Sequence, residues 1–194
     1  AGGQARAFAC DVTDPAAVVK LFDGLTRCDV LINNAGGNTP QPFLDVDVAT
    51  LDRLLTLNVR SMFLVAQAAA RVMARTGGGT IVHMSSQMGH VGGPQRSVYC
   101  MTKHAIEGLT KAMAIDLAPL GIRVNAVAPT YIETPMTKPF LEDPAFRADT
   151  VQRIPLGRIG TIEEVVAATL FLAAHEASLI TGTSLLVDGG YTAQ

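Results

Sequence analysis

The sequence predicts an α/β fold in which helices cover both faces of a doubly wound parallel sheet. Short aliphatic runs alternate along the chain with longer segments that have helical apolar spacing. Apolar residues make up 48% of the 194 residues and charged residues 16%, so the chain can bury a large core. Polar residues and glycines follow the aliphatic runs, where ligands bind in sheets of this kind.

The elements follow one another in a regular order. A first strand is predicted at 5–12, and a helix follows at 14–25, where Asp14 can cap the helix and Pro15 takes its first position. Strands are then predicted at 28–36, 79–86, 121–129 and 184–190, and helices at 47–75, 98–118 and 161–174.

No linker or repeat divides the chain, so we expect one domain over residues 1–194. The segment 129–155 contains five prolines and is long for a connection in a compact domain. We expect it to be a substrate loop or lid, with a flexible surface insertion as the alternative.

The composition excludes several classes of function. The net charge is −2 and no basic run occurs, which argues against nucleic acid and anionic membrane partners. The apolar run between Arg60 and Arg71 is too short to span a bilayer. Cys10, Cys28 and Cys100 are scattered, the four histidines lack metal-ligand spacing, and no signal peptide opens the chain. A reduced, cytoplasmic setting is expected.

Tyr99 and Lys103 are four residues apart in a predicted helix, so they share one face. To exchange protons near neutral pH, a tyrosine pKa of about 10 must fall by roughly 2 to 3 units, and a nearby cation supplies about 1 to 3. The charge of Lys103 alone is barely enough to lower the pKa of Tyr99 this far, and the positive charge of an oxidised nicotinamide would lower it further. Ser86 ends its strand thirteen residues before Tyr99 and can donate to the same substrate oxygen. The alternatives are a solvent-facing Tyr/Lys pair and a capping serine.

Three further motifs are uninformative alone. Asn58 lies among apolar residues of a predicted helix, where an amide is unfavourable, and it could hold a water next to Lys103 or be a satisfied core residue. The run 33–37, Asn-Asn-Ala-Gly-Gly, permits close approach of a ligand or a tight turn. Asp11 and Val12 end the first predicted strand.

Taken together, the order and intervals of these residues resemble the short-chain dehydrogenase/reductase family over essentially the whole chain. The motifs are Asp11-Val12, Asn33-Asn34-Ala35-Gly36, Asn58, Ser86, Tyr99-x-x-x-Lys103 and the loop NAVAPTYIETPM. The loop and the ending LLVDGGYTAQ look most like members that act on sugar alcohols and small secondary alcohols.

The resemblance implies a Rossmann-type sheet and a catalytic set. Tyr99 would be the general acid/base, and Lys103 would lower its pKa and bind the nicotinamide ribose. Ser86 would hold the substrate oxygen, and Asn58 would hold a proton-relay water. The implied contacts to NAD or NADP are Asp11, Val12, Asn33, Ala35, Gly36, Tyr99, Lys103, Pro129, Ile132 and Thr134.

The sequence departs from the family pattern in two ways. Thr130 stands where the family usually has Gly, which would alter the pocket. The family begins with a strand, a TGxxxGxG phosphate loop and a helix, and this chain opens at a segment that corresponds to the third strand. We expect a Rossmann-type domain that lacks its first βαβ portion, at least about 30 residues, and with it the residue that separates NAD from NADP.

The expected function is NAD(P)-dependent interconversion of a secondary alcohol and a ketone. The alternatives are a 3-ketoacyl carrier-protein reductase and a non-catalytic binding or assembly subunit. Sixteen of the twenty-four residues in 51–74 are apolar, more than one buried stripe requires, so we expect a homotetramer, with a helix buried inside one domain as the alternative. In some relatives with this ending, the terminal carboxylate region binds a divalent cation, which would place a structural Mg at Gln194. The alternative is a terminus held by the packing of Tyr191 alone.

Overall fold

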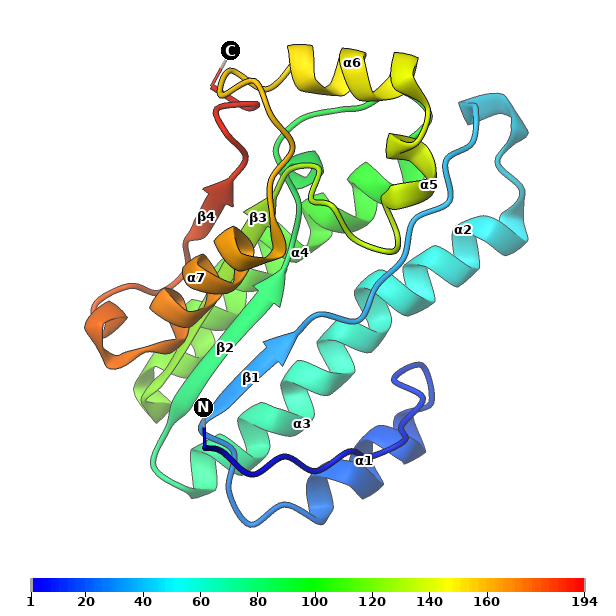
Figure 1. Ribbon diagram of the computed structural model, residues 1–194. Helices are drawn as coiled ribbons and strands as arrows, with labels where there is room; N and C mark the ends of the chain where they lie inside the picture. Colours follow the sequence, from blue (N-terminus) through cyan, green and yellow to red (C-terminus); the bar gives the residue numbers. More distant parts are fainter. Residues whose placement is uncertain (1, 194) are drawn as a thin grey trace.

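The computed structural model describes residues 2–193, and within them a four-stranded parallel sheet has the order β1-β2-β3-β4 (Figure 1). Neighbouring strands run in the same direction, with Val30 opposite Thr80 and Gly79 opposite Ile122. The α/β prediction is confirmed. The strands are β1 (Val30–Asn33), β2 (Gly79–Met84), β3 (Ile122–Pro129) and β4 (Ser184–Val187).

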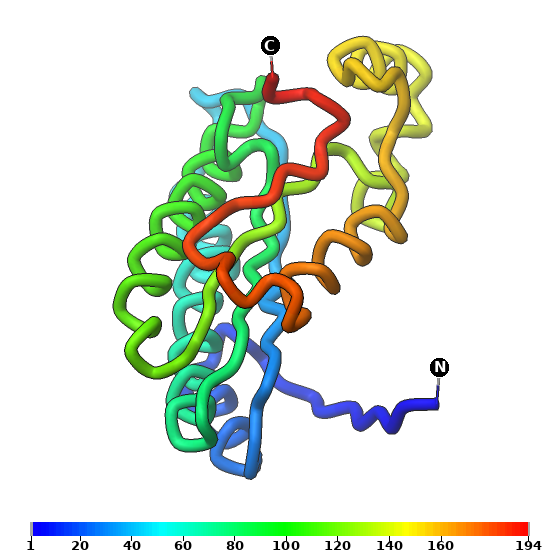
Figure 2. Tube along the Cα trace, turned by 90° about the vertical axis from the view of Figure 1, so that its left-hand side faces the viewer, coloured from blue at the N-terminus to red at the C-terminus, as the bar shows by residue number. Residues whose placement is uncertain are grey.

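Helices cover both faces of the sheet, as Figure 2 shows. Adjacent residues of β2 divide between the two faces because side chains alternate along a strand. Ile81 packs in one cluster with α3 and α4, and Val82 packs in another with Leu172 of α7. The helices are α1 (Pro15–Asp23), α2 (Val48–Leu55), α3 (Ser61–Arg75), α4 (Ser97–Leu117), α5 (Lys138–Leu141), α6 (Pro144–Gln152) and α7 (Ile162–Ala173).

Local sequence explains where two of these helices begin. The Asp14 side chain accepts a hydrogen bond from the Ala16 N–H at 2.9 Å, and Pro15 takes the first turn of α1. The Thr161 hydroxyl and the Glu164 carboxylate form a capping box at the start of α7. Both starts follow the prediction.

The helix predicted at 47–75 is continuous but not regular. Asp47 caps its start by accepting from the Thr50 N–H at 2.6 Å. Between α2 and α3, residues Thr56–Arg60 form one π-helical turn, η2, in which the backbone hydrogen bond spans five residues. The sequence did not predict this turn, which contains Asn58.

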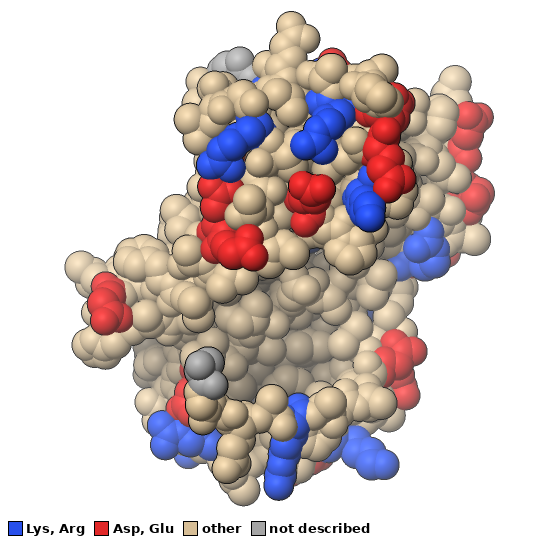
Figure 3. Space-filling model, viewed as in Figure 1, with Lys and Arg blue, Asp and Glu red and all other residues tan. Residues whose placement is uncertain are grey.

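The strand predicted at 5–12 is wrong. No regular structure forms there, residues 2–9 are exposed, and Figure 2 shows this segment extending away from the helices and sheet. A strand needs a hydrogen-bonded neighbour, and no described segment pairs with the outer edge of β1. The same edge leaves Val30 45% and Ile32 41% exposed, and Figure 3 shows a hollowed, uncharged surface at the middle of the molecule.

The segment 129–155 is more structured than a loop. It contains α5 and α6, and its buried residues Leu141 and Ile154 form a small cluster with Ile159. Tyr191 packs against this cluster. Gly189 and Gly190 have φ of 60° and 88°, which permits the chain to turn back there.

Candidate active site

The carboxyl end of β2 brings the predicted catalytic serine to the start of a short 3-10 turn, η3 (Gln87–Gly89). Ser86 is 8% exposed, and its Oγ accepts from the Met88 N–H at 3.1 Å. Ser86 therefore has the capping role that the sequence offered as an alternative. This role does not exclude a catalytic role, because the same hydroxyl is close enough to Tyr99 to hydrogen-bond with it.

Tyr99 and Lys103 lie one turn apart on α4, and Tyr99 lies beside this serine. The Lys103 Nζ lies 5.6 Å from the centroid of the Tyr99 ring and donates to the Met84 carbonyl at 2.7 Å. Lys103 is only 5% exposed. The alternative of a solvent-facing Tyr/Lys pair is therefore excluded.

Burial controls the proton affinities of both residues. Burial raises the pKa of Tyr99, and the hydrogen bond of the Ser86 hydroxyl offsets part of this rise. Burial also lowers the pKa of Lys103 to about 8, although the negative charge of Glu107 favours a higher value. The pKa of Tyr99 thus lies above its ordinary value although the charge of Arg96 also lowers it, so the lowering that the family mechanism requires needs further positive charge.

The π turn directs Asn58 into the interior, where its amide joins two elements. Asn58 is fully buried, and its Oδ1 accepts from the Gly37 N–H while its Nδ2 donates to the Gly37 carbonyl, both at 2.8 Å. Nδ2 also lies 3.2 Å from Thr102 Oγ1. A Cβ at Gly36 would come within 3.3 Å of Asn58 Oδ1. The structural reason for this glycine is therefore the approach of Asn58.

The predicted cofactor residues lie in three places. Asn33 donates from Nδ2 to the Met62 carbonyl at 2.8 Å, so its side chain joins β1 to α3. Ala35 stays exposed, and Gly36 is partly buried.

Asp11 and Val12 precede α1, where the Asp11 carboxylate accepts from Thr13. Those two bonds hold the Asp11 pKa below its ordinary value.

Pro129, Ile132 and Thr134 follow β3. The Thr134 N–H donates to Thr137 Oγ1 at 3.0 Å, and Ile132 is 7% exposed.

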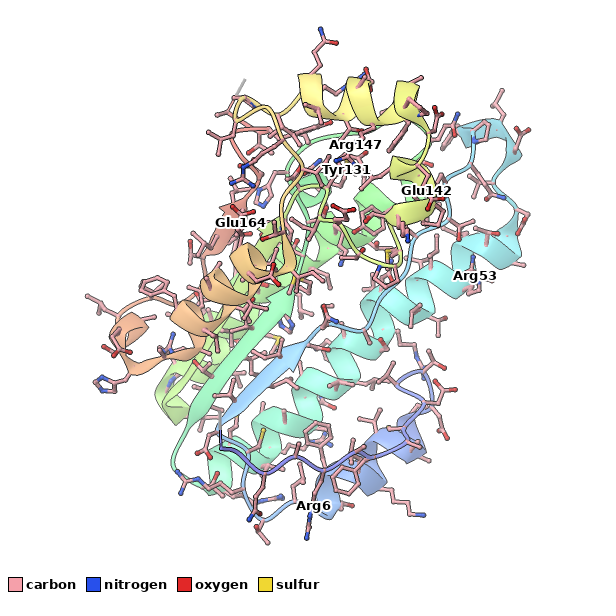
Figure 4. All side chains as sticks on the ribbon, viewed as in Figure 1. Arg6, Arg53, Tyr131, Glu142, Arg147 and Glu164 are labelled. Atoms are coloured by element: carbon pink, nitrogen blue, oxygen red, sulfur yellow. The ribbon has the colours of Figure 1, made fainter. Side chains whose placement is uncertain are left out.

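A cavity of about 80 Å³ lies beside the catalytic set. Thr130, the departure from the family pattern, forms part of its wall, and its Oγ1 is buried without a hydrogen-bond partner. Figure 4 shows Tyr131, another lining residue, beneath α6. Further lining residues are Ser86, Gln87, Arg96, Tyr99 and Phe140.

A larger hollow, about 200 Å³, is lined by Thr130, Arg158, Glu164 and Asp188. Its charged groups are already paired. Glu164 at the start of α7 (Figure 4) binds Arg158 with Oε1 to Nη2 at 2.6 Å. Asp188 accepts from the Thr192 N–H at 2.9 Å. We place the active site in the smaller cavity, which contains Tyr99.

Sequence reasoning missed two buried titratable residues near Lys103. His83 is fully buried and neither ring nitrogen has a hydrogen-bond partner. Burial, with a smaller contribution from Lys103, lowers its pKa to about 4. Glu107 accepts from the Ser85 hydroxyl and, at 3.1 Å, from Ser184 Oγ. Its position four residues after Lys103 was the only signal of this in the sequence.

Within residues 2–193, no group of three or more His, Cys, Asp or Glu side chains could hold a metal ion. Gln194, the expected magnesium position, lies outside the described residues. No helix in the described part of the chain is long and apolar enough to cross a membrane.

A family model described as enoyl-(acyl carrier protein) reductase matches residues 1–192. The chain belongs to the short-chain dehydrogenase/reductase family. This short-chain dehydrogenase/reductase is 42% identical over 184 residues to the L-xylulose reductase of Bos taurus, covering 94% of this chain and 75% of the relative. It is 42% identical over 196 residues to a cyclopentanol dehydrogenase of a Comamonas species, covering 99% of this chain and 78% of the relative.

Solved structures agree with the family assignment. A crystal structure of a putative NAD(P)-dependent gluconate 5-dehydrogenase from Beutenbergia cavernae, with bound NADP, superposes with a TM-score of 0.95 at 35% identity. The superposition covers 100% of this chain and 79% of the crystal structure's chain. The crystal structure of a short-chain type dehydrogenase/reductase from Mycobacterium marinum superposes with a TM-score of 0.94 at 42% identity. This match covers 100% of this chain and 78% of the Mycobacterium marinum chain.

Proposed function

We propose that this short-chain dehydrogenase/reductase transfers a hydride between NAD or NADP and a polyol, sugar or small secondary alcohol, forming the ketone. The observation that carries the proposal is that Ser86 and Tyr99 line one cavity at the end of β2, with the Lys103 Nζ 5.6 Å from the centroid of the Tyr99 ring. Relatives named for xylulose, cyclopentanol and threitol support this substrate range.

The residues of the set have separate roles. Tyr99 exchanges the proton with the substrate oxygen, and Ser86 hydrogen-bonds to that oxygen. Lys103 holds a positive charge behind the tyrosine ring. Asn58 fixes the loop after β1 to α4 and holds a relay water next to Lys103.

The residues present fit a nicotinamide cofactor, which carries the hydride when bound. The backbone of Asn34 and Ala35 is open where the chain leaves β1 at the carboxyl edge of the sheet. It would contact the adenosine part, and Asp11 and Val12 would contact adenine. Pro129, Ile132 and Thr134 would lie toward the nicotinamide. Bound NADP in a structural relative supports this class of cofactor.

A 3-ketoacyl carrier-protein reductase is the second candidate, because the description of the family model also names a reductase of carrier-protein substrates, although an enoyl one. Such an enzyme needs free basic residues near the pocket mouth to dock an acidic carrier. Of four arginines considered for this role, Arg153 and Arg158 pair with Asp149 and Glu164, Arg96 is buried in the cavity wall, and only Arg147 is exposed without an ion pair among the described residues. Figure 3 shows acidic and basic side chains mixed over this face. We therefore favour a free alcohol as the substrate.

Replacement of Tyr99 by Phe tests the proposal, because it removes the hydroxyl and keeps the ring. We expect the turnover number for NAD(P)-dependent oxidation of xylitol or cyclopentanol to fall by at least about 100-fold. Tyr191→Phe, which removes a hydroxyl outside the cavity, is the control. Near-normal turnover in Tyr99→Phe would overturn the catalytic assignment. A folded wild-type chain that binds cofactor but oxidises no alcohol would indicate a non-catalytic subunit.

A further inference from the structure

The cavity beside Tyr99 contains a buried positive charge that no acidic side chain neutralises. Arg96 lines the cavity and is 9% exposed. Across residues 2–193, no carboxylate forms an ion pair with its guanidinium. Its Cζ lies 5.7 Å from the centroid of the Phe140 ring. Burial of an unpaired charge is costly, so this arrangement needs an explanation.

The contact with Phe140 does not provide one. A cation over an aromatic face is attracted to the ring, but a guanidinium has five N–H donors that the ring leaves without acceptors. Those donors match the two oxygens of a carboxylate. Arg96 therefore has unused capacity for an anion within the cavity.

The backbone holds Arg96 in place from both sides. Gln95 is the only described non-glycine residue with positive φ, at 55°, and its carbonyl accepts from the Gln41 N–H at 3.1 Å. The Arg96 carbonyl accepts from the Cys100 N–H at 2.7 Å at the start of α4. The left-handed conformation of Gln95 is unfavourable for a side chain of this type, and it recurs at sites where geometry matters.

Polar atoms in the same wall form a second, independent observation. Asn38 Oδ1, Gln87 Oε1 and Thr130 Oγ1 are buried without hydrogen-bond partners, and all three residues line this cavity. Buried polar atoms normally have partners. Two amide oxygens and a hydroxyl would accept hydrogen bonds from alcohol groups. No acidic residue lines the cavity to repel an anion.

We propose that the substrate of this site is a hydroxy acid, whose carboxylate binds Arg96 while the reacting alcohol lies at Tyr99 and Ser86. A further hydroxyl group of the substrate donates to Gln87 or Asn38. This inference rests on the proposed alcohol oxidation and specifies its substrate class. Arg96 is a specificity residue in it, three residues before the general acid/base.

The experiment compares each acid with its uncharged amide of nearly the same shape. Gluconate is paired with gluconamide, and 3-hydroxybutyrate with 3-hydroxybutyramide. In the wild type, we expect kcat/KM to favour the acid by about 10- to 100-fold, the range for a hydrogen bond to a charged group. Arg96→Met should abolish this preference, and Arg96→Lys should restore part of it. Arg75→Met, which removes an exposed arginine at the end of α3, should retain it.

A binding measurement separates failure of this inference from failure of the proposed function. The side-chain Nε–H signal of Arg96 in an NMR spectrum, assigned with Arg96→Lys, should shift on addition of gluconate and not of gluconamide. A shift without turnover would retain the anion site and reject the oxidation. Turnover of amides and acids alike, or an equal loss for both in Arg96→Met, would overturn the anion site.

Discussion

Lys103 lies between two titratable neighbours that affect its charge in opposite ways. His83 is buried beside it and stays neutral, with its pKa lowered to about 4. Glu107, four residues further along α4, favours the charged lysine. Burial leaves the Lys103 pKa at about 8, so at pH 7 this part of the site has one cation. That charge is available to stabilise a tyrosinate at Tyr99.

His83 makes stability depend on pH in a defined window. The unfolded histidine has a pKa of 6.5, and the folded one about 4. As the pH falls from 6.5 to 4 the unfolded chain binds the extra proton, so stability is lost in that range. The full difference between the two pKa values corresponds to about 3 kcal/mol in the free energy of unfolding.

We expect urea titrations at pH 7 and pH 4.5 to show a smaller loss of stability in His83→Phe than in the wild type. His175→Asn, at an exposed position, should behave like the wild type. An identical pH dependence in His83→Phe and the wild type would show that His83 protonates freely in the folded state.

At the scale of elements, the helix that contains Asn58 and the segment that covers the cavity differ in how they are held. The π turn η2 is fixed by Asn58, which bonds to Gly37 and Thr102 from two other elements. By contrast, α5 and α6 have a separate small cluster of buried residues, and Met136 and Phe140 of this segment are 51% and 37% exposed. Few contacts join that cluster to the sheet, which favours local opening.

We therefore expect segment 129–155 to close over bound ligands. Backbone amides of α5 and α6 should exchange hydrogen more slowly when cofactor and alcohol are both present, because opening then also breaks contacts with them. Amides of α3, which has nine buried residues, serve as the internal control. Equal protection of 129–155 with and without ligands would identify it as a surface insertion.

At the scale of the molecule, two long helices leave apolar side chains in solvent. Phe63 on α3 is 46% exposed, and Met101 and Ile115 on α4 are 46% and 76% exposed. Burying such side chains against a second copy would be favourable. We propose that these faces form subunit contacts of a homotetramer with closed symmetry.

Sedimentation equilibrium at micromolar concentration tests the assembly. We expect a tetramer for the wild type and a smaller species for Phe63→Glu, because a buried carboxylate opposes association. Val19→Glu, at an equally exposed position of α1, should leave the tetramer intact. A monomeric wild type would exclude these contacts.

The sequence by itself determined the features that depend on near neighbours in the chain. Aliphatic runs and helical spacing predicted four strands of the sheet and the long helices, since side-chain periodicity depends only on local geometry. Asp14 and Pro15 predicted the start of α1 for the same reason. The interval from Tyr99 to Lys103 placed both on one face of α4, and the family motifs added Ser86 and Asn58.

Only the tertiary structure decided the features that depend on distant partners. The segment 5–12 has a strand-like sequence, but no strand of the described residues lies beside it, so it forms no strand. Gly36 allows close approach, yet the group that approaches is Asn58, from a π turn. In the sequence, Arg96 is one of several arginines that could lie near the pocket mouth. Its burial without an acidic partner follows from where β2, α4 and α5 meet, and long-range contacts of this kind leave no local pattern.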